Sequence, residues 1–240
     1  MIKHGTHDLD DTFFETSKQF FDRISGSANY LNKSLHVGDE ILISQIRESI
    51  RNAKLTHAVH PGKIMTEVIK DLNTYYPKNS KDIRKAMKIL KSAWIDVPEL
   101  IPGTIEYLKY LKSIGVHVTA VTNALPTWTK NKIAVINKNE ELIKIENVYC
   151  IPVTRRKIDK DWDKVLKKSK YNLEHTFGVG DDIHADLMSI YSTGVTNLIR
   201  VLVDIGFVNK GKELPEHIKV YTVSSHIESI EIVKTWLKGT

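Results

Sequence analysis

The segment ELIPGTIEYLKYLKSIGVHVTAVTN, residues 99–123, places a helix pattern directly before a strand pattern. Apolar residues recur at helical spacing over residues 104–114, and Gly115 is of the type that commonly follows the last turn of a helix. Residues 116–123 then alternate in hydropathy and are rich in β-branched side chains, which is typical of a strand. A helix that leads straight into a strand is the repeating unit of α/β proteins, so this segment predicts an α/β fold.

The same alternation continues toward the C-terminus. Four further strand patterns follow, at residues 147–153, 175–180, 197–203 and 219–223. Helical patterns occur at residues 162–170 and 184–194 and from Ser225 onward, where Ser225 and Glu228 have capping-box spacing. Strands that alternate with helices predict a parallel, doubly wound sheet of the Rossmann-like type, with helices on both faces.

The N-terminal part has a different pattern. One short strand is expected before Asp8, whereas residues 14–97 carry helical periodicity with no strand pattern between the helices. Asp39 and Ser80 are expected to cap two of these helices. The sequence therefore predicts two domains: an α/β core of residues 1–14 and 98–240, and an all-helical cap of residues 15–97 inserted after the first strand.

The composition is that of an ordinary globular protein. Of the 240 residues, 41% are hydrophobic and 27% are charged, and the single cysteine, Cys150, cannot form an internal disulfide. Neither a signal-peptide pattern nor an apolar run of about 18 residues is present, so we expect a cytoplasmic protein without a membrane partner. The net charge of +6 favours anionic ligands, but the lysines are scattered along helices, so nucleic acid is not an expected partner. The oligomeric state stays open.

Polar and charged side chains follow four of the predicted strands. They are Asp8 and Asp10; Thr122 and Asn123; Arg155, Arg156, Lys157 and Lys160; and Asp181, Asp182 and Asp186. The carboxyl ends of parallel strands meet at one edge of a sheet, where ligands bind in folds of this type. Carboxylates suit a hard cation such as Mg²⁺, while hydroxyl, amide and cationic groups suit a phosphate. Taken singly, each acidic motif is also compatible with a solvated turn or a helix N-terminus.

Together and in this order, these segments resemble the four motifs of the haloacid dehalogenase-like (HAD) hydrolase superfamily. The matching segments are DLDDT at 8–12, VTN at 121–123, the lysine of RRKIDK at 155–160, and GDDIHAD at 180–186. Residues 99–123 also resemble the lead-in to the second motif, and the helical insert resembles a C1-type cap. The resemblance covers essentially the whole chain and is closest to phosphoglycolate phosphatase-like members.

The resemblance implies hydrolysis of a small phosphate monoester through an aspartyl-phosphate intermediate. Asp8 would be the nucleophile, and Asp10 would protonate the leaving oxygen and then deprotonate the hydrolytic water. Thr122 and Asn123 would bind phosphate oxygens, and Lys157 would balance charge between the nucleophile and the phosphate. The prolines that commonly follow the family's lysine are missing here, so three neighbouring cations stay open as alternatives: Arg155, Arg156 and Lys160.

The resemblance also implies a Mg²⁺ cofactor. Asp8, Asp181 and the backbone carbonyl of Asp10 would be ligands. Asp182 and Asp186 are second candidates, for a ligand or for orienting metal-bound water. Five acidic groups at one edge of a sheet would be costly without a compensating cation.

The second aspartate of DLDDT decides between related activities. Haloacid dehalogenases of similar layout lack it, because a halide departs without a proton. Phosphonoacetaldehyde-type hydrolases replace it and use a cap lysine, for which Lys54 is available here. Asp10 therefore favours a phosphatase. A sugar phosphomutase on the same core, or a binding protein that keeps the fold without turnover, stays open.

The cap is expected to set substrate selectivity. Loops near Phe13, Phe14 and residues 55–62 are expected to close over the site and exclude water. His57 and His60 in the second loop are candidates for substrate contact, although histidines in a polar loop more often face solvent.

The segment before Asp8, IKHGTH at residues 2–7, is unusually polar for a strand of a parallel sheet, which is normally buried on both faces. We predict that the strand still forms, weakened by Gly5. We expect His4 and His7 to be hydrogen-bonded to neighbours or to fill gaps between helices. A pH-tuning role for His7, next to the expected nucleophile, is the alternative.

Overall fold

The computed structural model describes residues 1–202 and 215–238. The chain divides into two compact units. The first contains Met1–Ser17, Pro98–Ile151 and Lys157–Thr240, and the second contains Lys18–Val97 together with Pro152–Arg156. The chain thus leaves the first unit soon after its first strand, returns at Pro98, and contributes one short later segment to the second unit.

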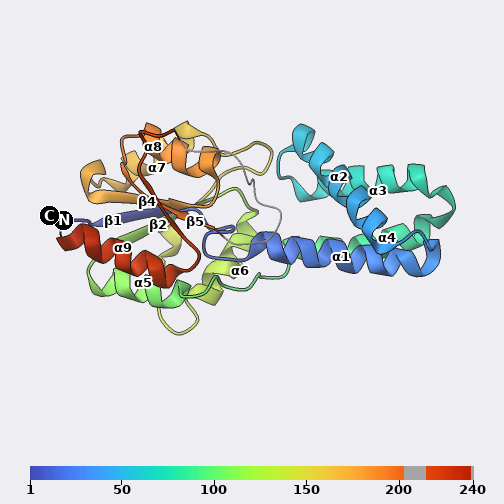
Figure 1. The fold of residues 1–240 in the computed structure, drawn as a ribbon, viewed down its shortest axis with the longest axis horizontal. Helices are drawn as coiled ribbons and strands as arrows, with labels where there is room; N and C mark the ends of the chain where they lie inside the picture. The colour runs from blue at the N-terminus through green and yellow to red at the C-terminus, as the bar shows by residue number, and fades with distance from the viewer. Residues whose placement is uncertain (203–214, 239–240) are drawn as a thin grey trace. The chain divides into compact units, whose positions relative to one another are not determined.

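The first unit contains a six-stranded parallel sheet (Figure 1). The strand order is β3-β2-β1-β4-β5-β6, and every neighbouring pair is parallel. The strands are β1 (His4–His7), β2 (His117–Thr122), β3 (Val148–Cys150), β4 (Thr176–Gly180), β5 (Asn197–Val201) and β6 (Val220–Val223). The chain winds outward from β1 first to one side and then to the other. This order confirms the predicted doubly wound α/β fold.

Helices cover both faces of this sheet (Figure 1). One face carries α5 (Thr104–Ser113), α6 (Pro126–Ile136) and α9 (His226–Lys238), and the other carries α7 (Asp159–Ser169) and α8 (Ser189–Ser192). The direction of winding reverses after β3. Because crossovers between parallel strands are right-handed, the connecting helices before and after this reversal lie on opposite faces.

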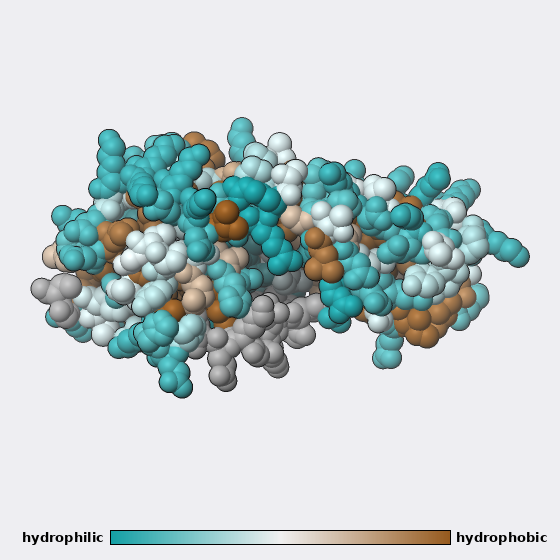
Figure 2. Space-filling model, turned by 90° about the horizontal axis from the view of Figure 1, so that it is seen from above, coloured by the Kyte–Doolittle hydropathy of each residue, from teal (hydrophilic) through white to brown (hydrophobic). Residues whose placement is uncertain are grey.

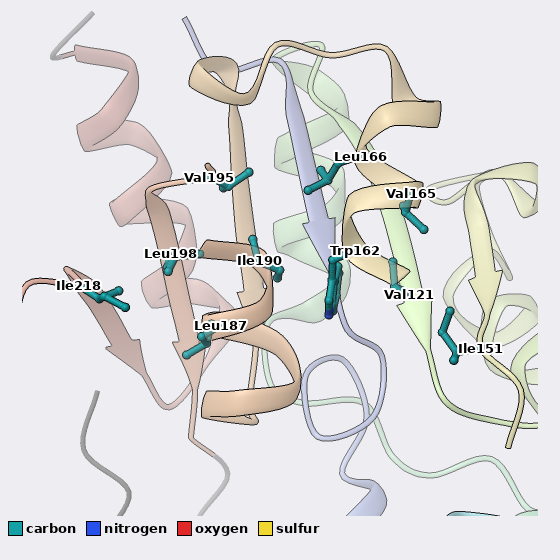
Figure 3. Packing of buried hydrophobic residues seen from close by; sticks show 10 residues of the cluster. All are labelled: Val121, Ile151, Trp162, Val165, Leu166, Leu187, Ile190, Val195, Leu198 and Ile218. Atoms are coloured by element: carbon teal, nitrogen blue, oxygen red, sulfur yellow. The ribbon is translucent and has the colours of Figure 1, made fainter. Parts of the chain in front are cut away.

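An apolar core fills the space between the sheet and helices α7 and α8 (Figure 3). Trp162 is fully buried there, among side chains that include Val121, Leu187 and Ile190. Its Nε1 donates to the carbonyl oxygen of Ala185 at 2.7 Å. Truncating a buried tryptophan costs roughly 3–5 kcal/mol. The core therefore holds firmly the two helical segments that follow β3 and β4.

The polar strand β1 forms in the middle of the sheet, and all four of its residues are buried. His4 Nε2 lies 2.9 Å from Thr119 Oγ1, and its ring stacks on Tyr171 with the centroids 4.7 Å apart. His7 Nε2 lies 2.9 Å from Tyr107 Oη. The prediction that the strand forms with hydrogen-bonded histidines is confirmed, because each ring has a polar partner from a neighbouring element.

Burial keeps these histidines neutral. Desolvation, followed by repulsion from His117, lowers the pKa of His4 to about 4. Desolvation, followed by repulsion from His226 and His4, lowers the pKa of His7 well below its ordinary value. A residue that tunes the site near pH 7 needs a pKa close to 7, so His7 is a neutral core histidine. Gly5 makes room for it, since a Cβ there would lie 2.6 Å from His7 Cε1.

Every secondary-structure element in the second unit is a helix. Its elements are α1 (Thr16–Leu35), which begins in the first unit, α2 (Asp39–His57), α3 (Pro61–Tyr75), η1 (Pro77–Asn79), α4 (Ser80–Lys91) and η2 (Ser92–Trp94). Fully buried side chains from the four α-helices form its core, among them Leu31, Leu42, Ile64 and Ile83. We keep this unit as the proposed cap domain.

Two predicted helix caps are wrong. Asp39 and Ser80 are the first residues of α2 and α4, and Gly38 and Asn79 occupy the N-cap positions. Gly38 adopts φ 101°, a conformation that glycine reaches without strain. The Ser80 hydroxyl donates to Asn73 Oδ1 at 2.5 Å instead of capping its own helix.

Other elements differ in extent from the sequence patterns. Helix α6 was not predicted, and β3 has three residues where seven were expected, because Pro152 cannot donate to a strand ladder. The helix expected at residues 184–194 begins as a π-helical segment, η5 (Ile183–Met188), before α8. Val203, the last residue of one predicted strand, lies outside the described residues.

The face of the molecule drawn in Figure 2 is mainly hydrophilic, and its apolar areas are separated from one another. Exposed large apolar side chains come from several elements, including Ile41, Tyr75 and Ile227. Within residues 1–202 and 215–238, no helix is both long enough and apolar enough to span a membrane.

Candidate active site

Asp8 lies at the carboxyl end of β1. Its backbone N–H donates to the carbonyl oxygen of Val179 at 3.0 Å, which continues the pairing of β1 with β4 by one residue. The side chain is buried, with 4% of its surface exposed, and its Oδ1 accepts a hydrogen bond from Lys157 Nζ. The sheet therefore fixes the backbone of Asp8, and a buried ion pair fixes its carboxylate.

Lys157 is the cation that contacts Asp8. Its Nζ also lies 2.6 Å from Asp186 Oδ1 and 5.1 Å from the centre of the Trp162 ring. Of the four basic residues considered for this role, Lys157 is buried, whereas the other three are exposed: Arg155, Arg156 and Lys160. Burial and contact with Asp8 thus favour Lys157, the first choice of the sequence analysis, over the three alternatives.

Asn123 holds the Lys157 loop. Its Oδ1 accepts from the backbone N–H of Lys157 at 2.8 Å, and its Nδ2 donates to the carbonyl oxygen of Ile151 at 3.3 Å. Both ends of this amide therefore bind the chain that follows β3. The side chain was expected to bind phosphate, and here it orders the segment that delivers the lysine.

Three carboxylates converge beside this lysine. Asp8, Asp181 and Asp186 each offer an oxygen, and these oxygens lie within 4.8 Å of one another. Gly180 allows this approach, because a Cβ there would come within 2.5 Å of Asp186 Cβ and 2.8 Å of its Oδ2. Carboxylate oxygens at this spacing are a donor set that suits a hard divalent cation such as Mg²⁺.

The charge of this cluster is unbalanced. Desolvation and repulsion among the carboxylates raise the pKa of Asp8 and Asp181 well above the ordinary value, although Lys157 opposes the rise. Desolvation likewise raises the pKa of Asp186. The pKa of Lys157 is also raised, because its attraction to Asp186 and Asp8 exceeds the effect of burial. One ammonium for three carboxylates leaves negative charge that a divalent cation would neutralise.

Asp182 has a different task from its neighbours. Its Oδ1 accepts from the backbone N–H groups of His184 and Ala185 at 2.8 and 2.9 Å, so it caps η5. A carboxylate in this position satisfies the free donors of a helix start and needs no metal. Of the two second-rank metal candidates, the structure therefore brings Asp186 to the cluster and keeps the Asp182 carboxylate at a helix cap.

Asp10 lies in a separate, balanced environment. Its Oδ1 accepts from Thr16 Oγ1 at 2.7 Å and from Lys132 Nζ, and its Oδ2 accepts from Thr122 Oγ1 at 3.0 Å. Desolvation raises the pKa of Asp10, but the charge of Lys132 and the three hydrogen bonds outweigh it, so the pKa is lowered. The Thr122 hydroxyl, expected on phosphate, donates its one proton to Asp10 in this structure.

Lys132 was missed by the sequence analysis. It belongs to α6, an element that was not predicted, and its side chain is fully buried. Its Nζ lies 3.5 Å from the centre of the Trp128 ring, four residues earlier on the same helix. A lysine one turn after a tryptophan is a weak signal, because residues four apart are also neighbours on exposed helix surfaces.

The residues expected to line the cap loops are distributed between the two units. Phe13 and Phe14 are fully buried within the first unit, where Phe13 stacks on His7 with centroids 5.1 Å apart. They are core residues there, and closure of the loops near them over the site stays a prediction. In the second unit, His60 Nδ1 accepts from the N–H of Lys63 at 3.3 Å and caps α3. His57 Nε2 lies 3.9 Å from a carboxylate oxygen of Glu67 in α3.

Solved structures with this fold match almost the whole chain, although no family model and no curated protein matches the sequence. A haloacid dehalogenase-like family hydrolase from Xanthomonas campestris has a TM-score of 0.76 at 15% identity, covering 98% of this chain and 95% of that one. L-2-haloacid dehalogenase from Xanthobacter autotrophicus has a TM-score of 0.65 at 13% identity, and the match covers 98% of this chain and 99% of that one. A HAD phosphatase from Thermococcus onnurineus has a TM-score of 0.61 at 14% identity, and the match covers 97% of this chain and 98% of that one.

A magnesium-bound structure, that of YfnB from Bacillus subtilis, matches with a TM-score of 0.65 at 14% identity, covering 97% of this chain and 99% of that one. At identities this low the matches show the fold alone, and proteins with this fold include both a dehalogenase and a phosphatase. These matches show that the described part of the chain has the fold of the haloacid dehalogenase-like hydrolases, as the four motifs predicted.

Proposed function

We propose that this protein is a Mg²⁺-dependent phosphatase that hydrolyses a small phosphate monoester through an aspartyl-phosphate intermediate. The observation that carries the proposal is the shortage of positive charge around Asp8, a buried carboxylate that shares the ammonium of Lys157 with Asp186. A buried carboxylate with an adjacent lysine and further carboxylates for a cation is what phosphoryl transfer to an aspartate requires.

Mg²⁺ would be held by the carboxylates of Asp8, Asp181 and Asp186, with the backbone carbonyl of Asp10 as a further proposed ligand. When bound, the ion would act as a Lewis acid that neutralises charge on the phosphoryl group. The donor set supports this choice, since hard oxygen ligands select Mg²⁺ over softer metals. Lys157 would contribute the fixed part of the positive charge.

In the first step, a carboxylate oxygen of Asp8 attacks phosphorus and the bond from phosphorus to the ester oxygen breaks, while Asp10 delivers a proton to that oxygen. In the second step, water attacks the phosphorus of the aspartyl-phosphate and gives its proton to Asp10. The bond from phosphorus to Asp8 then breaks, and inorganic phosphate leaves. Each step needs one proton transfer at Asp10.

Asp10 supports phosphate chemistry over dehalogenation, since a halide leaves without a proton. Its lowered pKa favours the carboxylate, which is the form that accepts the proton of water. The same property leaves less of the protonated form, which is the form that would deliver a proton to a poor leaving group. We therefore expect substrates with good leaving groups, such as aryl phosphate esters or acyl phosphates, to be turned over faster than simple alkyl phosphates.

The test is release of inorganic phosphate from p-nitrophenyl phosphate and a panel of acyl, sugar, nucleoside and alkyl phosphates, with and without Mg²⁺. Asp8→Asn is the matched control, because it keeps the size of the side chain and removes the nucleophile. Halide release from 2-haloacids is measured in parallel.

Phosphate release that needs both Mg²⁺ and Asp8 would support the proposal. Halide release without phosphate release would replace it with a dehalogenase, and isomerised sugar phosphate without free phosphate would replace it with a phosphomutase. Equal phosphate release by the wild type and Asp8→Asn would refute the role of Asp8. If neither phosphate nor halide is released from any compound of the panel, a binding protein with the same fold would be favoured.

A further inference from the structure

We infer that Lys132 is a positioning residue for Asp10: its ammonium holds one carboxylate oxygen so that the group presents a single orientation to the reacting atoms. The inference rests on the proposed function for its kinetic consequence, and on the structure alone for its geometric one. Nothing in the four-motif pattern of the sequence points to this residue.

The environment of Lys132 is unusual for a lysine. In the part of the chain that the structure describes, only Lys132 and Lys157 are buried lysines, and Lys132 has no exposed surface. Its Nζ contacts Asp10 Oδ1, lies 3.4 Å from Thr16 Oγ1, and faces the Trp128 ring at 3.5 Å. A buried ammonium is costly unless its donors are satisfied, and these three neighbours satisfy them.

A purely structural role accounts poorly for this lysine. Replacing a whole buried ion pair by well-packed apolar side chains of similar volume is often neutral or stabilising. The apolar surroundings supplied by Trp128 and Phe14 would accept such a side chain. The ammonium is therefore best explained by its effect on its partner, Asp10.

The effect on Asp10 is geometric. Hydrogen bonds reach its carboxylate from three separate elements: Thr16 at the start of α1, Thr122 at the end of β2 and Lys132 in α6. Donors on both oxygens fix the plane of the carboxylate as well as its position. The side chain nevertheless keeps 26% of its surface exposed, so it stays accessible while it is held. Catalytic groups need this kind of support, because displacement of about 1 Å can lower a rate by about 100-fold.

Lys132 and Lys157 serve different carboxylates. Lys157 contacts Asp8 and Asp186, and Lys132 contacts Asp10. Any effect of Lys132 on the reaction should therefore be transmitted by Asp10, and it should disappear when the Asp10 carboxylate is removed.

The first readout is structural and independent of activity. Crystal structures of the wild type, Lys132→Met and the control Thr129→Val are compared. Thr129 is also buried in α6, and its hydroxyl has no hydrogen-bond partner among the described residues, so the control changes packing in the same helix. We expect the Asp10 side chain to rotate or split into two conformers in Lys132→Met alone, with the contacts of Lys157 unchanged. An unmoved Asp10 would overturn the inference.

The second readout is a double-mutant cycle on kcat and KM. Lys132→Met is expected to lower kcat about 10- to 100-fold, with KM changed by less than about threefold. In an Asp10→Asn background the same substitution should have no further effect on kcat, because its target is already lost. If the double variant instead lost kcat by the product of the two single-variant losses, Lys132 would act independently of Asp10, and the inference would be overturned.

A third variant covers the case in which Lys132→Met does not fold. Lys132→Gln keeps a hydrogen-bond donor without the charge, on a side chain one bond shorter, and is expected to retain the orientation of Asp10 in part and to give an intermediate kcat. Asp10 in its wild-type orientation with wild-type kcat in both variants would refute the inference. If the wild type releases no phosphate from any ester, the proposed function fails, and the crystal structures still decide whether Lys132 positions Asp10.

Discussion

Asp8 and Asp10 are two residues apart and have opposite electrostatic surroundings. Asp8 shares Lys157 with Asp186 and stands close to Asp181, and its pKa is raised. Asp10 has Lys132 and two hydroxyl donors, and its pKa is lowered. Two carboxylates whose environments separate their pKa values in this way can take different parts in one reaction. A bound cation would balance the charge around Asp8, whereas the charge of Asp10 is already balanced by Lys132.

The largest effect is expected from Asp8→Asn. The substitution removes the attacking oxygen but keeps the size of the side chain, so kcat for phosphate release should fall by about 10⁴-fold or more. Steady-state kinetics with p-nitrophenyl phosphate measure the loss, and mass spectrometry after acid quenching detects any phosphorylated protein. A phosphorylated Asp8→Asn protein would show that another residue is the nucleophile.

Asp10→Asn should be the next most damaging change, and its effect should depend on the leaving group. General acid and base catalysis contributes roughly 10²- to 10⁴-fold, and a good leaving group needs less help from the acid. We expect a smaller loss with p-nitrophenyl phosphate than with an alkyl phosphate. Equal losses with both esters would mean that Asp10 contributes only to the hydrolysis of the intermediate.

Gly180→Ala tests the carboxylate cluster around Asp8. The new Cβ would collide with Asp186, so Mg²⁺ affinity should fall about tenfold, as it does when metal ligands lose their support. Titration of Mg²⁺ against phosphatase rate or protein fluorescence gives the affinity. Gly26→Ala in α1 is the matched control, since its Cβ would meet only Ile89 Cγ2 at 3.5 Å. Loss of Mg²⁺ affinity in the control would contradict this explanation.

The pH dependence of stability tests whether a cation binds at the carboxylate cluster of Asp8, Asp181 and Asp186. The pKa values of Asp8 and Asp181 are raised in the folded state, so the folded metal-free protein binds more protons than the unfolded chain, and stability falls as pH rises through these values. Bound Mg²⁺ would relieve that loss. The gain in Tm on adding Mg²⁺ should therefore be larger at pH 8 than at pH 5. Buried histidines such as His4 have lowered pKa values, so they make stability rise with pH. That contribution is the same with and without Mg²⁺, so it cancels in the difference between the two Tm values. Equal gains at both pH values would argue against a metal at this cluster.

Asp182→Ala should have the smallest effect. Loss of the cap on η5 should lower the free energy of unfolding by about 1 kcal/mol. Because its carboxylate caps η5 and is separate from the three clustered oxygens, Mg²⁺ affinity should stay within about twofold of the wild type. Urea denaturation measures the first quantity, and the titration used for Gly180→Ala measures the second. A large loss of Mg²⁺ affinity would assign Asp182 to the metal site after all.

Much of the fold could be predicted because its elements have clear periodicity. The stretch from residue 99 to residue 123 carries a helix and a strand in full, and the later strands follow the same rule. Helix α6 escaped because it follows β2 directly and its stretch, PTWTKNKIAVI, mixes polar and apolar residues on all sides. Helix caps failed for a related reason: several residues near a boundary are suitable, and tertiary contacts choose among them.

The site was predictable where residues directly follow strands, and unpredictable elsewhere. Asp8 and Asp181 were found because parallel strands deliver their ends to one edge. Lys132 was not, because it reaches Asp10 across 122 positions of sequence from the middle of a helix. The side chain of Asn123 has the residue type expected for phosphate, and only the hydrogen bonds reveal that it holds the Lys157 loop.

The polar strand β1 has a consequence for how accurately the nucleophile is placed. A strand of valines and isoleucines can slide by two residues and bury the same kind of side chain. If β1 did so, His4 would lose Thr119 and His7 would lose Tyr107, and each unpaired buried group costs about 1–3 kcal/mol. Such a slip would carry Asp8 about 7 Å from Lys157. The hydrogen bonds of His4 and His7 thus fix the register of β1, and with it the position of Asp8.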